Sequence, residues 1–316
     1  MTRTIISILA GVLMPTIAVI ADEKLSIVTT TTDLADFARV IGKERVNVVS
    51  LSRGDQDPHA VEPRPSMVMK VKKADMLIRV GMDLDLWVDG LIDASRNGKI
   101  RRGVRGYLDK GARGYLDVSE TIEKLEVPEG KVDGSMGDIH IYGNPHYWTS
   151  PENADRMCGL ICARMCDLRP GEAEHFKQNL AQYTKKLDSA FIKWKETMLP
   201  FAQAPIVTYH NSWPYFTQSF GLTIAGYVEP KPGIPPTPSH ITDLVQTMKS
   251  GDARVIIMEP WFNLKTAKAI AQKAGARVVV LSPSVGGVKG TDTYIDLMAY
   301  NVTILSETLG KREGTP

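Results

Sequence analysis

The sequence of 316 residues predicts an α/β protein: two α/β lobes with parallel sheets, joined by one long linking helix. Short β-branched runs alternate with helical patterns in residues 25–95, and the same alternation returns in residues 205–309. Between them, residues 171–199 carry one long amphipathic pattern. Strands that alternate with helices indicate βαβ units, and hence parallel sheets.

An N-terminal targeting segment precedes the first expected strand. Arg3 is followed by an almost wholly apolar run over residues 5–20, and Ala21 is followed at once by charged residues 22–24. This pattern is typical of a cleaved secretory signal peptide. A retained membrane anchor is the alternative, but Ala21 and the abrupt change of polarity favour cleavage. We therefore expect a signal peptide over residues 1–21 and a mature protein in the periplasm. No cysteine follows the signal, so a lipid anchor is not expected.

The first predicted lobe covers residues 22–169. The patterns predict strands at 25–30, 46–50 and 75–80, and helices at 34–41, 64–72 and 87–95. Asp33 is placed to cap the first helix, and Pro65 suits the first turn of the second. Residues 99–145 are rich in glycine and turn formers, so we expect mainly loop there.

Three cysteines, Cys158, Cys162 and Cys166, recur at four-residue spacing and so share one face of a helix. Three thiols on one face can indicate a soft metal site. Because Met157 and Ile161 lie among them, we favour the alternative, that the cysteines are small buried residues that pack in the core.

The linking helix is expected over residues 170–200. Apolar residues recur at steps of three and four from Phe176 to Trp194, and Pro200 ends the pattern. A helix of that length spans roughly 40 Å at 1.5 Å per residue. It is long enough to run along both lobes.

The second predicted lobe covers residues 201–316. Strands are predicted at 205–209, 222–227, 255–258 and 278–281, and helices at 213–220, 241–250, 265–274 and 294–309. The proline-rich stretch 229–238 reads as a rigid loop. Such a loop could border the cleft, dock on a partner, or be a plain surface segment.

Composition excludes several functions. The formal net charge is only +2, which argues against an extended nucleic-acid surface. The sequence contains no GxxxxGK[ST] phosphate-binding loop, and no HExxH or paired CxxC zinc signature. Chemistry must therefore come from residues that lie far apart in the chain.

Three of the six histidines share a context that suggests metal binding. His59 and His210 follow predicted strands in opposite halves of the chain, where open α/β sheets bind their ligands. Pro58 and Pro145 stiffen the backbone immediately before His59 and His146. Neutral imidazole suits zinc, copper, nickel and iron, whereas carboxylates suit magnesium, calcium and manganese. Three imidazoles therefore favour zinc.

The mature chain resembles, over essentially all of its length, the zinc- and manganese-binding receptors of bacterial metal ABC importers. The resemblance is carried by five ordered blocks: Asp57-Pro58-His59 with Pro65-Ser66, Asn144-Pro145-His146-Tyr147-Trp148, Tyr209-His210-Asn211-Ser212-Trp213 with Phe216 and Gly221-Leu222, Glu259-Pro260-Trp261-Phe262, and Tyr294 with Met298 and Asn301. It implies a metal buried in the cleft between the lobes. His59 and His146 match the ligands of the first lobe. His210 matches a third ligand that is His in zinc-binding members and often Glu in manganese-binding ones.

The fourth ligand is where the sequence departs from the family pattern. The family usually has an Asp after the last strand of the second lobe, but residues 281–284 here contain no carboxylate. We expect Glu259, at the end of the preceding strand, to be the substitute. The alternatives are Asp292, water, or a structural role for Glu259. His140 is expected to be a loop residue rather than a relay or outer metal site.

The resemblance implies an extracytoplasmic solute-binding protein that captures a divalent metal ion, with zinc expected, and delivers it to an ABC permease in the cytoplasmic membrane. Manganese or iron is the alternative cargo. We expect a monomer that binds no nucleic acid and is not an enzyme. A zinc hydrolase that uses an open fourth position, with Glu259 as general base, is the competing hypothesis. An additional role as an adhesin would leave the site unchanged.

Overall fold

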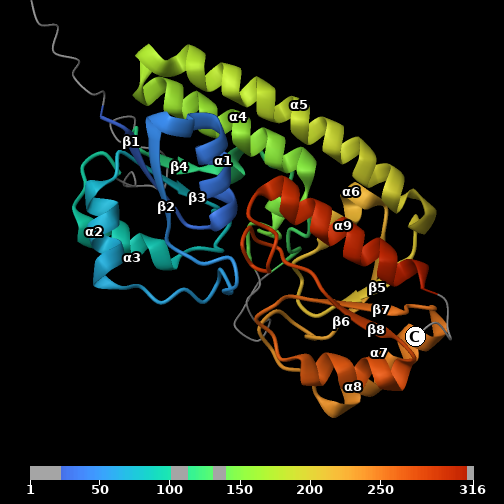
Figure 1. Ribbon diagram of the computed structural model, residues 1–316. Helices are drawn as coiled ribbons and strands as arrows, with labels where there is room; N and C mark the ends of the chain where they lie inside the picture. The colour runs from blue at the N-terminus through green and yellow to red at the C-terminus, as the bar shows by residue number, and fades with distance from the viewer. Residues whose placement is uncertain (1–22, 101–112, 131–139, 312–316) are drawn as a thin grey trace, which may run out of the picture.

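The computed structural model describes residues 23–100, 113–130 and 140–311 (Figure 1). Two α/β lobes lie side by side, and one long helix runs along both of them. The predicted fold class is confirmed. The predicted signal peptide, residues 1–21, lies outside the described residues. Among the described helices, none is long and apolar enough to cross a membrane.

The sheet of the first lobe has four parallel strands in the order β2-β1-β3-β4. Its strands are β1 (Leu25–Thr29), β2 (Val46–Ser50), β3 (Met76–Arg79) and β4 (Tyr115–Asp117). The sequence patterns predicted the first three and missed β4, because three residues are too few to show an alternation. A side chain at Gly114, just before β4, would lie 2.3 Å from the carbonyl oxygen of Asp75. Glycine therefore allows the close approach that starts this edge strand.

Helices cover both faces of this sheet. They are α1 (Thr32–Gly42), α2 (Pro65–Lys73), α3 (Trp87–Ser95) and α4 (Pro151–Leu168). Successive strand residues point to opposite faces. Ile27 and Ile78 belong to the core that includes α1 and α4, whereas Val28 and Leu77 belong to the core under α2 and α3. Burial on both faces explains why the strands read as continuous apolar runs.

Asp33 does not cap the first helix as predicted. Thr31 is the N-cap residue, and it makes no side-chain cap hydrogen bond. Asp33 is fully buried, and its Oδ1 accepts a hydrogen bond from the backbone N–H of Val285 at 3.0 Å. The Asp33 side chain thus links the two lobes by a hydrogen bond and does not cap helix α1.

The second lobe repeats the same plan. Its strands β5 (Pro205–Thr208), β6 (Thr223–Tyr227), β7 (Val255–Met258) and β8 (Arg277–Val280) form a parallel sheet in the order β6-β5-β7-β8. Its helices are α6 (Pro214–Phe220), α7 (Pro238–Ser250), α8 (Leu264–Ala274) and α9 (Tyr294–Gly310). Helix α7 begins three residues earlier than predicted, because Thr237 accepts a hydrogen bond from the N–H of His240 and caps it.

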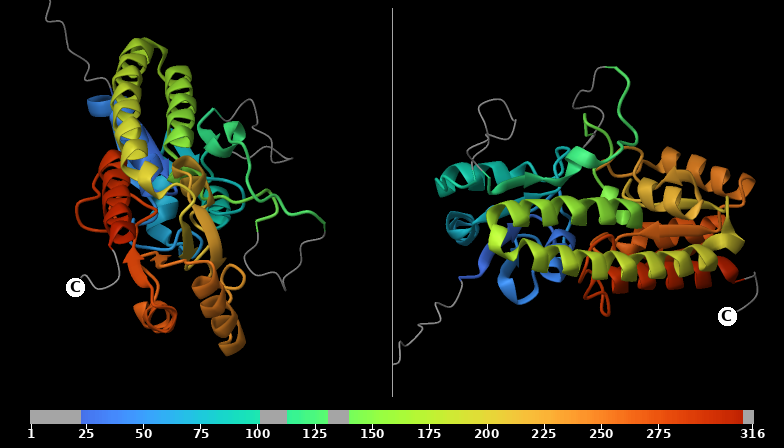
Figure 2. Two further views of the ribbon diagram at one scale, coloured as in Figure 1. Left: turned by 90° about the vertical axis from the view of Figure 1, so that its right-hand side faces the viewer. Right: turned by 90° about the horizontal axis from the view of Figure 1, so that it is seen from above.

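The long helix α5 (Ala173–Met198) has a short 3-10 helix at each end, Pro170–Glu172 and Leu199–Phe201. It contacts α1 and α4 of the first lobe and α9 of the second (Figure 2). Phe176 near its start and Met198 at its end are both fully buried. The helix therefore packs against both lobes along its length, and its 26 residues span about 39 Å.

Further hydrogen bonds join the lobes across their junction. The backbone N–H of Tyr294 donates to Asp36 at 2.8 Å, and the Tyr294 hydroxyl donates to the carbonyl of Trp148 at 2.7 Å. The indole N–H of Trp148 donates to the carbonyl of Pro283 at 2.7 Å. These contacts, with α5, limit independent movement of the two lobes.

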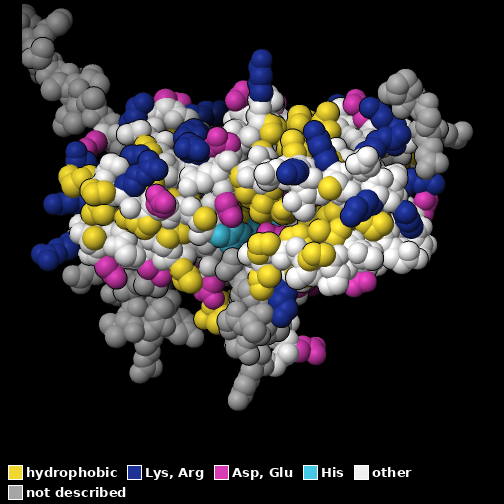
Figure 3. All heavy atoms as spheres, turned by 90° about the horizontal axis from the view of Figure 1, so that it is seen from below, with side chains coloured by type: hydrophobic (Ala, Val, Ile, Leu, Met, Phe, Trp, Pro, Cys, Tyr) yellow, Lys and Arg dark blue, Asp and Glu magenta, His cyan; other side chains and the backbone are white. Residues whose placement is uncertain are grey.

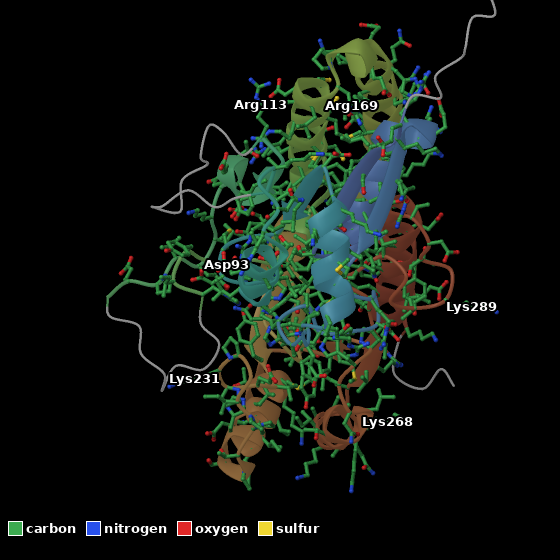
Figure 4. The ribbon with its side chains drawn as sticks, turned by 90° about the vertical axis from the view of Figure 1, so that its left-hand side faces the viewer. Asp93, Arg113, Arg169, Lys231, Lys268 and Lys289 are labelled. Atoms are coloured by element: carbon green, nitrogen blue, oxygen red, sulfur yellow. The ribbon has the colours of Figure 1, made fainter. Side chains whose placement is uncertain are left out.

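The three cysteines lie on α4. Cys158 and Cys162 are buried in the core, and Cys166 is half-buried beside it. Burial raises the pKa of the Cys158 thiol well above its usual value. The packing role predicted for this face agrees with these positions. In contrast to these buried thiols, charged side chains on other elements, such as Asp93, Lys268 and Lys289, lie at the periphery of the molecule (Figure 4).

Candidate metal centre

Three histidines from distant parts of the chain meet where the lobes join. His59 lies in the loop after β2, His146 lies just before the short 3-10 helix Tyr147–Thr149, and His210 follows β5. The ring centroids are 5.0 Å apart for His59 and His146, and 5.4 Å apart for each of the other two pairs. One ligand atom from each of the three residues lies within 4.8 Å of the other two. The structure thus brings together the three histidines that the sequence singled out.

The two histidines of the first lobe are held by the same local motif. The Oδ1 atom of Asp57 accepts from both the backbone N–H and the ring Nδ1 of His59, at 2.9 and 2.7 Å. The Oδ1 atom of Asn144 does the same for His146, at 2.9 and 3.0 Å. Because each Nδ1 donates its proton to an oxygen, each Nε2 keeps its lone pair for a metal ion.

His210 is oriented by a residue from another segment. Its Nδ1 lies 2.7 Å from Oε2 of Glu229, which follows β6 and is itself buried. The same carboxylate accepts the backbone N–H of Gly233 at 3.2 Å. All three Nδ1 atoms are therefore bonded to oxygen acceptors, which leaves the three Nε2 atoms as the potential ligands.

The surroundings of His146 and His210 shift their pKa values in opposite directions. Burial, together with the charges of His59 and His210, holds the pKa of His146 well below its usual value, so the ring is neutral. Burial also disfavours the charged form of His210, but the hydrogen bond with Glu229 and the charge of Glu259 outweigh it, and its pKa lies above the usual value. A cation that binds His210 must therefore displace a proton held more firmly than normal.

A cavity of about 410 Å³ opens in front of the histidines. His140, His146 and His210 line it, with Glu126 and Glu129 on its wall. Figure 3 shows histidine side chains at the junction of the lobes, between hydrophobic and acidic side chains. His146 and His210 are only 3% and 7% exposed, so a bound ion would lie at the bottom of the cavity and be largely shielded from water.

Aromatic rings complete the surroundings of the cluster. The ring of Trp148 lies 5.4 Å from that of His146, and the ring of Phe262 lies 6.1 Å from that of His210. Phe262 also stacks on Tyr209 at 4.4 Å. These contacts give a physical role to the aromatic residues in three of the motifs noted in the sequence: they fix the imidazoles and exclude water.

Glu259 lies beside the cluster rather than among its members. It is fully buried, its Oε1 accepts the indole N–H of Trp213 at 3.0 Å, and its Oε2 has no hydrogen-bond partner. Burial raises the pKa of Glu259 to about 7, opposed by the nearby charge of His210. The group of ligand atoms within 4.8 Å of one another does not include Glu259, so its role as fourth ligand stays a prediction.

Two other predictions concern the fourth position. Asp292, the weaker candidate, is exposed on the loop before α9. Ser282 occupies the segment where the family usually has an Asp, and it is bonded to Asn301 through its backbone N–H at 3.1 Å and its carbonyl at 2.7 Å.

His140 lies in a loop, as expected, but its Nε2 is only 3.2 Å from Nε2 of His59. Burial lowers the pKa of His140 to about 3.

The residues that orient the three histidines, namely Asp57, Asn144 and Glu229, were not predicted to have that role. Asp57 and Asn144 each precede a histidine by two positions, with a proline between, so the paired Asp-Pro-His and Asn-Pro-His spacing was a usable signal. Glu229 offered none, because it lies 19 residues from His210 and reaches it only through the β5–β6 pairing.

The fold and the histidine cluster define a two-lobed α/β protein with a candidate metal site where its lobes meet. A family model described as "Zinc-uptake complex component A periplasmic" matches residues 27–308. The chain belongs to this family, and the predicted resemblance is confirmed.

Curated relatives of this chain carry different metals in their names. The chain is 25% identical over 298 residues to the zinc-binding lipoprotein AdcA of Streptococcus pneumoniae, covering 91% of this chain and 56% of that protein. It therefore spans little more than half the length of that relative. It is 25% identical over 299 residues to the manganese ABC transporter substrate-binding lipoprotein PsaA of Streptococcus mitis, covering 92% of this chain and 90% of that one. For the iron-binding protein YfeA of Yersinia pestis, identity is 25% over 298 residues, covering 92% and 88%.

Solved structures share the fold. A crystal structure of ZnuA matches with a TM-score of 0.74 at 23% identity, covering 90% of this chain and 99% of that one. The Mn-bound periplasmic metal binding protein from candidatus liberibacter asiaticus matches with a TM-score of 0.73 at 23% identity, covering 90% and 100%.

Proposed function

We propose that this chain is an extracytoplasmic solute-binding protein that captures one divalent metal ion and delivers it to the permease of an ABC importer. The observation that carries the proposal is the convergence of His59, His146 and His210 from two lobes, each with its Nδ1 bonded to an oxygen acceptor. The family match and the printed names of AdcA, PsaA and YfeA support the same class of function.

Zinc is the proposed cargo. Three neutral imidazoles are a preferred ligand set for zinc, whereas manganese prefers oxygen ligands. His210 supports zinc further, since manganese-binding members resembling this chain often have a glutamate there. A manganese or iron receptor of the same type is the alternative, and relatives named for each metal are equally similar to this chain.

Capture would proceed by ligand exchange. A hydrated cation enters the cavity, loses water to the imidazoles and displaces the proton of His210. Glu259 remains the sequence-based candidate for the fourth ligand. A divalent ion that displaces the His210 proton adds one net positive charge to the site, which favours ionisation of the buried Glu259 carboxyl beside it.

The proposal also covers the domain organisation of the chain and the location of the protein. Residues 1–21 would direct export to the periplasm, 22–169 form the first lobe, 170–200 the linking helix, and 201–316 the second lobe. The protein would work as a monomer with a membrane permease as its partner. The hydrolase alternative requires turnover, and a screen of ester, peptide and lactam substrates with the zinc-bound protein tests it.

Metal analysis of purified variants tests the proposed site. We expect one zinc per chain in the unchanged protein, and loss of tightly bound zinc when His59, His146 or His210 is replaced by Ala. His175→Ala is a matched control, because His175 lies on α5 and pairs with Glu44 on the surface. Full zinc content and affinity in His210→Ala would contradict the three-histidine site.

A further inference from the structure

His140 lies very close to one of the three clustered histidines, His59. Its Nε2 lies 3.2 Å from Nε2 of His59, and the two ring centroids are 5.2 Å apart. In a tetrahedral zinc site with Zn–N bonds of about 2.0–2.1 Å, two nitrogen ligands lie about 3.3–3.4 Å apart. The spacing between His59 and His140 therefore matches, within about 0.2 Å, one edge of such a tetrahedron.

The atoms that face each other have the character of ligands. Nδ1 of His59 is bonded to Asp57, so Nε2 of His59 carries a lone pair. His140 bonds the backbone of Met82, which anchors its ring on the first lobe. Two imidazole nitrogens at this distance share either a proton or a cation, and His140 lines the cavity where the ion is proposed to bind.

The backbone also holds His140 at the site. Its carbonyl accepts the N–H of Gly143 at 3.1 Å, and Asn144 donates to the carbonyl of Leu125 at 2.8 Å. Gly143 has a φ of +103°, so it permits the tight turn that carries the chain from His140 to His146. His140 thus projects into the same cavity as the other ligands.

His140 is farther from the remaining histidines than from His59. Its ring centroid lies 6.5 Å from that of His146, against 5.0–5.4 Å within the three-histidine cluster. Like Glu259, His140 lies outside the group of ligand atoms that are all within 4.8 Å of one another, so ligation requires its half-buried side chain to move toward His146 and His210. Glu259 has one free oxygen, Oε2, but its Oε1 is held by the indole N–H of Trp213, and Oε2 makes no hydrogen bond with any of the three histidines.

We infer that His140 is the fourth ligand of the bound ion, giving a site of four imidazoles and no carboxylate. This inference rests on the proposed function, since it assumes the three-histidine site. Such a ligand set favours zinc over manganese, which prefers oxygen ligands. His140 would therefore also contribute to metal selectivity, taking the coordination position that a carboxylate fills in family members with the usual Asp.

The test compares His140→Ala, Glu259→Gln and the control His175→Ala, each loaded with zinc alone. X-ray absorption at the zinc edge should give four imidazole nitrogens in the unchanged protein and three, with one water oxygen as the fourth ligand, in His140→Ala. Zinc affinity should fall by at least the roughly 10- to 100-fold that loss of an outer partner costs, while the content stays at one zinc per chain. Glu259→Gln should leave the imidazole count at four.

An unchanged imidazole count and affinity in His140→Ala would overturn this inference and leave the three-histidine site intact. Loss of zinc in His210→Ala is the separate requirement of the proposed function, so the two failures are distinguishable. Equal thermal unfolding of the metal-free His140→Ala and His175→Ala proteins establishes that the fold is not the cause of any difference.

Discussion

The hydrogen bond between Glu229 and His210 offers a quantitative test of how the site is built. Both side chains are buried, and Nδ1 of His210 lies 2.7 Å from Oε2 of Glu229. Glu229→Gln keeps an oxygen acceptor but removes the charge that supports the imidazole as it binds a cation. Hydrogen bonds to charged groups contribute about 1.5–3 kcal/mol, and loss of outer partners of metal ligands typically costs about 10- to 100-fold in affinity. These two ranges agree, since 10- to 100-fold is about 1.4–2.7 kcal/mol.

A competition titration of zinc against a chromophoric chelator measures this effect. The matched control is Glu129→Gln, which removes a carboxylate from the wall of the same cavity at an exposed position. Screening by salt should keep the control within about twofold of the unchanged protein. Glu229→Gln with an affinity within twofold of the unchanged protein would refute the orienting role of Glu229. An equal loss in both variants would show that cavity charge, and not the hydrogen bond, matters.

Three further predictions concern the fold. Burial raises the pKa of Asp33 to about 7, so the folded protein binds a proton more tightly than the unfolded chain, and the free energy of unfolding falls as pH rises from about 4 to about 7. In urea unfolding of the metal-free protein, Asp33→Asn should reduce the total change in the free energy of unfolding over this pH range by up to about 4 kcal/mol. An unchanged pH dependence would contradict the prediction. Asp85→Ala removes the Oδ1 atom that accepts hydrogen bonds from both Nε and Nη2 of the buried guanidinium of Arg79, which keeps its ion pair with Asp89. It should cost about 1.5–3 kcal/mol in the same assay, whereas a loss below about 0.5 kcal/mol would count against that pairing. Cys158, whose burial raises its pKa, should resist iodoacetamide in the native protein and react after unfolding, as read by mass spectrometry; labelling at equal rates would disprove its burial.

Much of the fold could be predicted because local patterns agree with the packing. Helix α3 and strand β7 have the predicted bounds, since each is a short apolar segment with clear ends. Strand β4 could not be found, because its three residues form an edge strand only through their pairing with β3. Asp33 was misassigned because a residue before a helix normally caps it, and only the fold brings Val285 within reach.

The three proposed ligands could be predicted for a different reason. His59 and His210 follow strands of the two separate sheets, and open α/β sheets bind their ligands beyond the carboxyl ends of their strands. Pro145 drew attention to His146, the motif resemblance supported all three histidines, and the structure brings them together. The carboxylate that bonds His210 and the histidine that neighbours His59 were harder to predict from the sequence. The pairing of Glu229 with His210, and of His140 with His59 across 81 residues, depends on how loops fold over the cavity, which no local pattern records.

The most direct test of the central claim is an anomalous difference map at the zinc edge, from crystals of the purified protein loaded with one equivalent of zinc. The expected result is a single strong peak between the lobes, about 2.0–2.1 Å from Nε2 of His59, His146 and His210. A principal peak elsewhere, or one bonded to fewer than two of these three atoms, would contradict the claim that this histidine cluster is the metal-binding site.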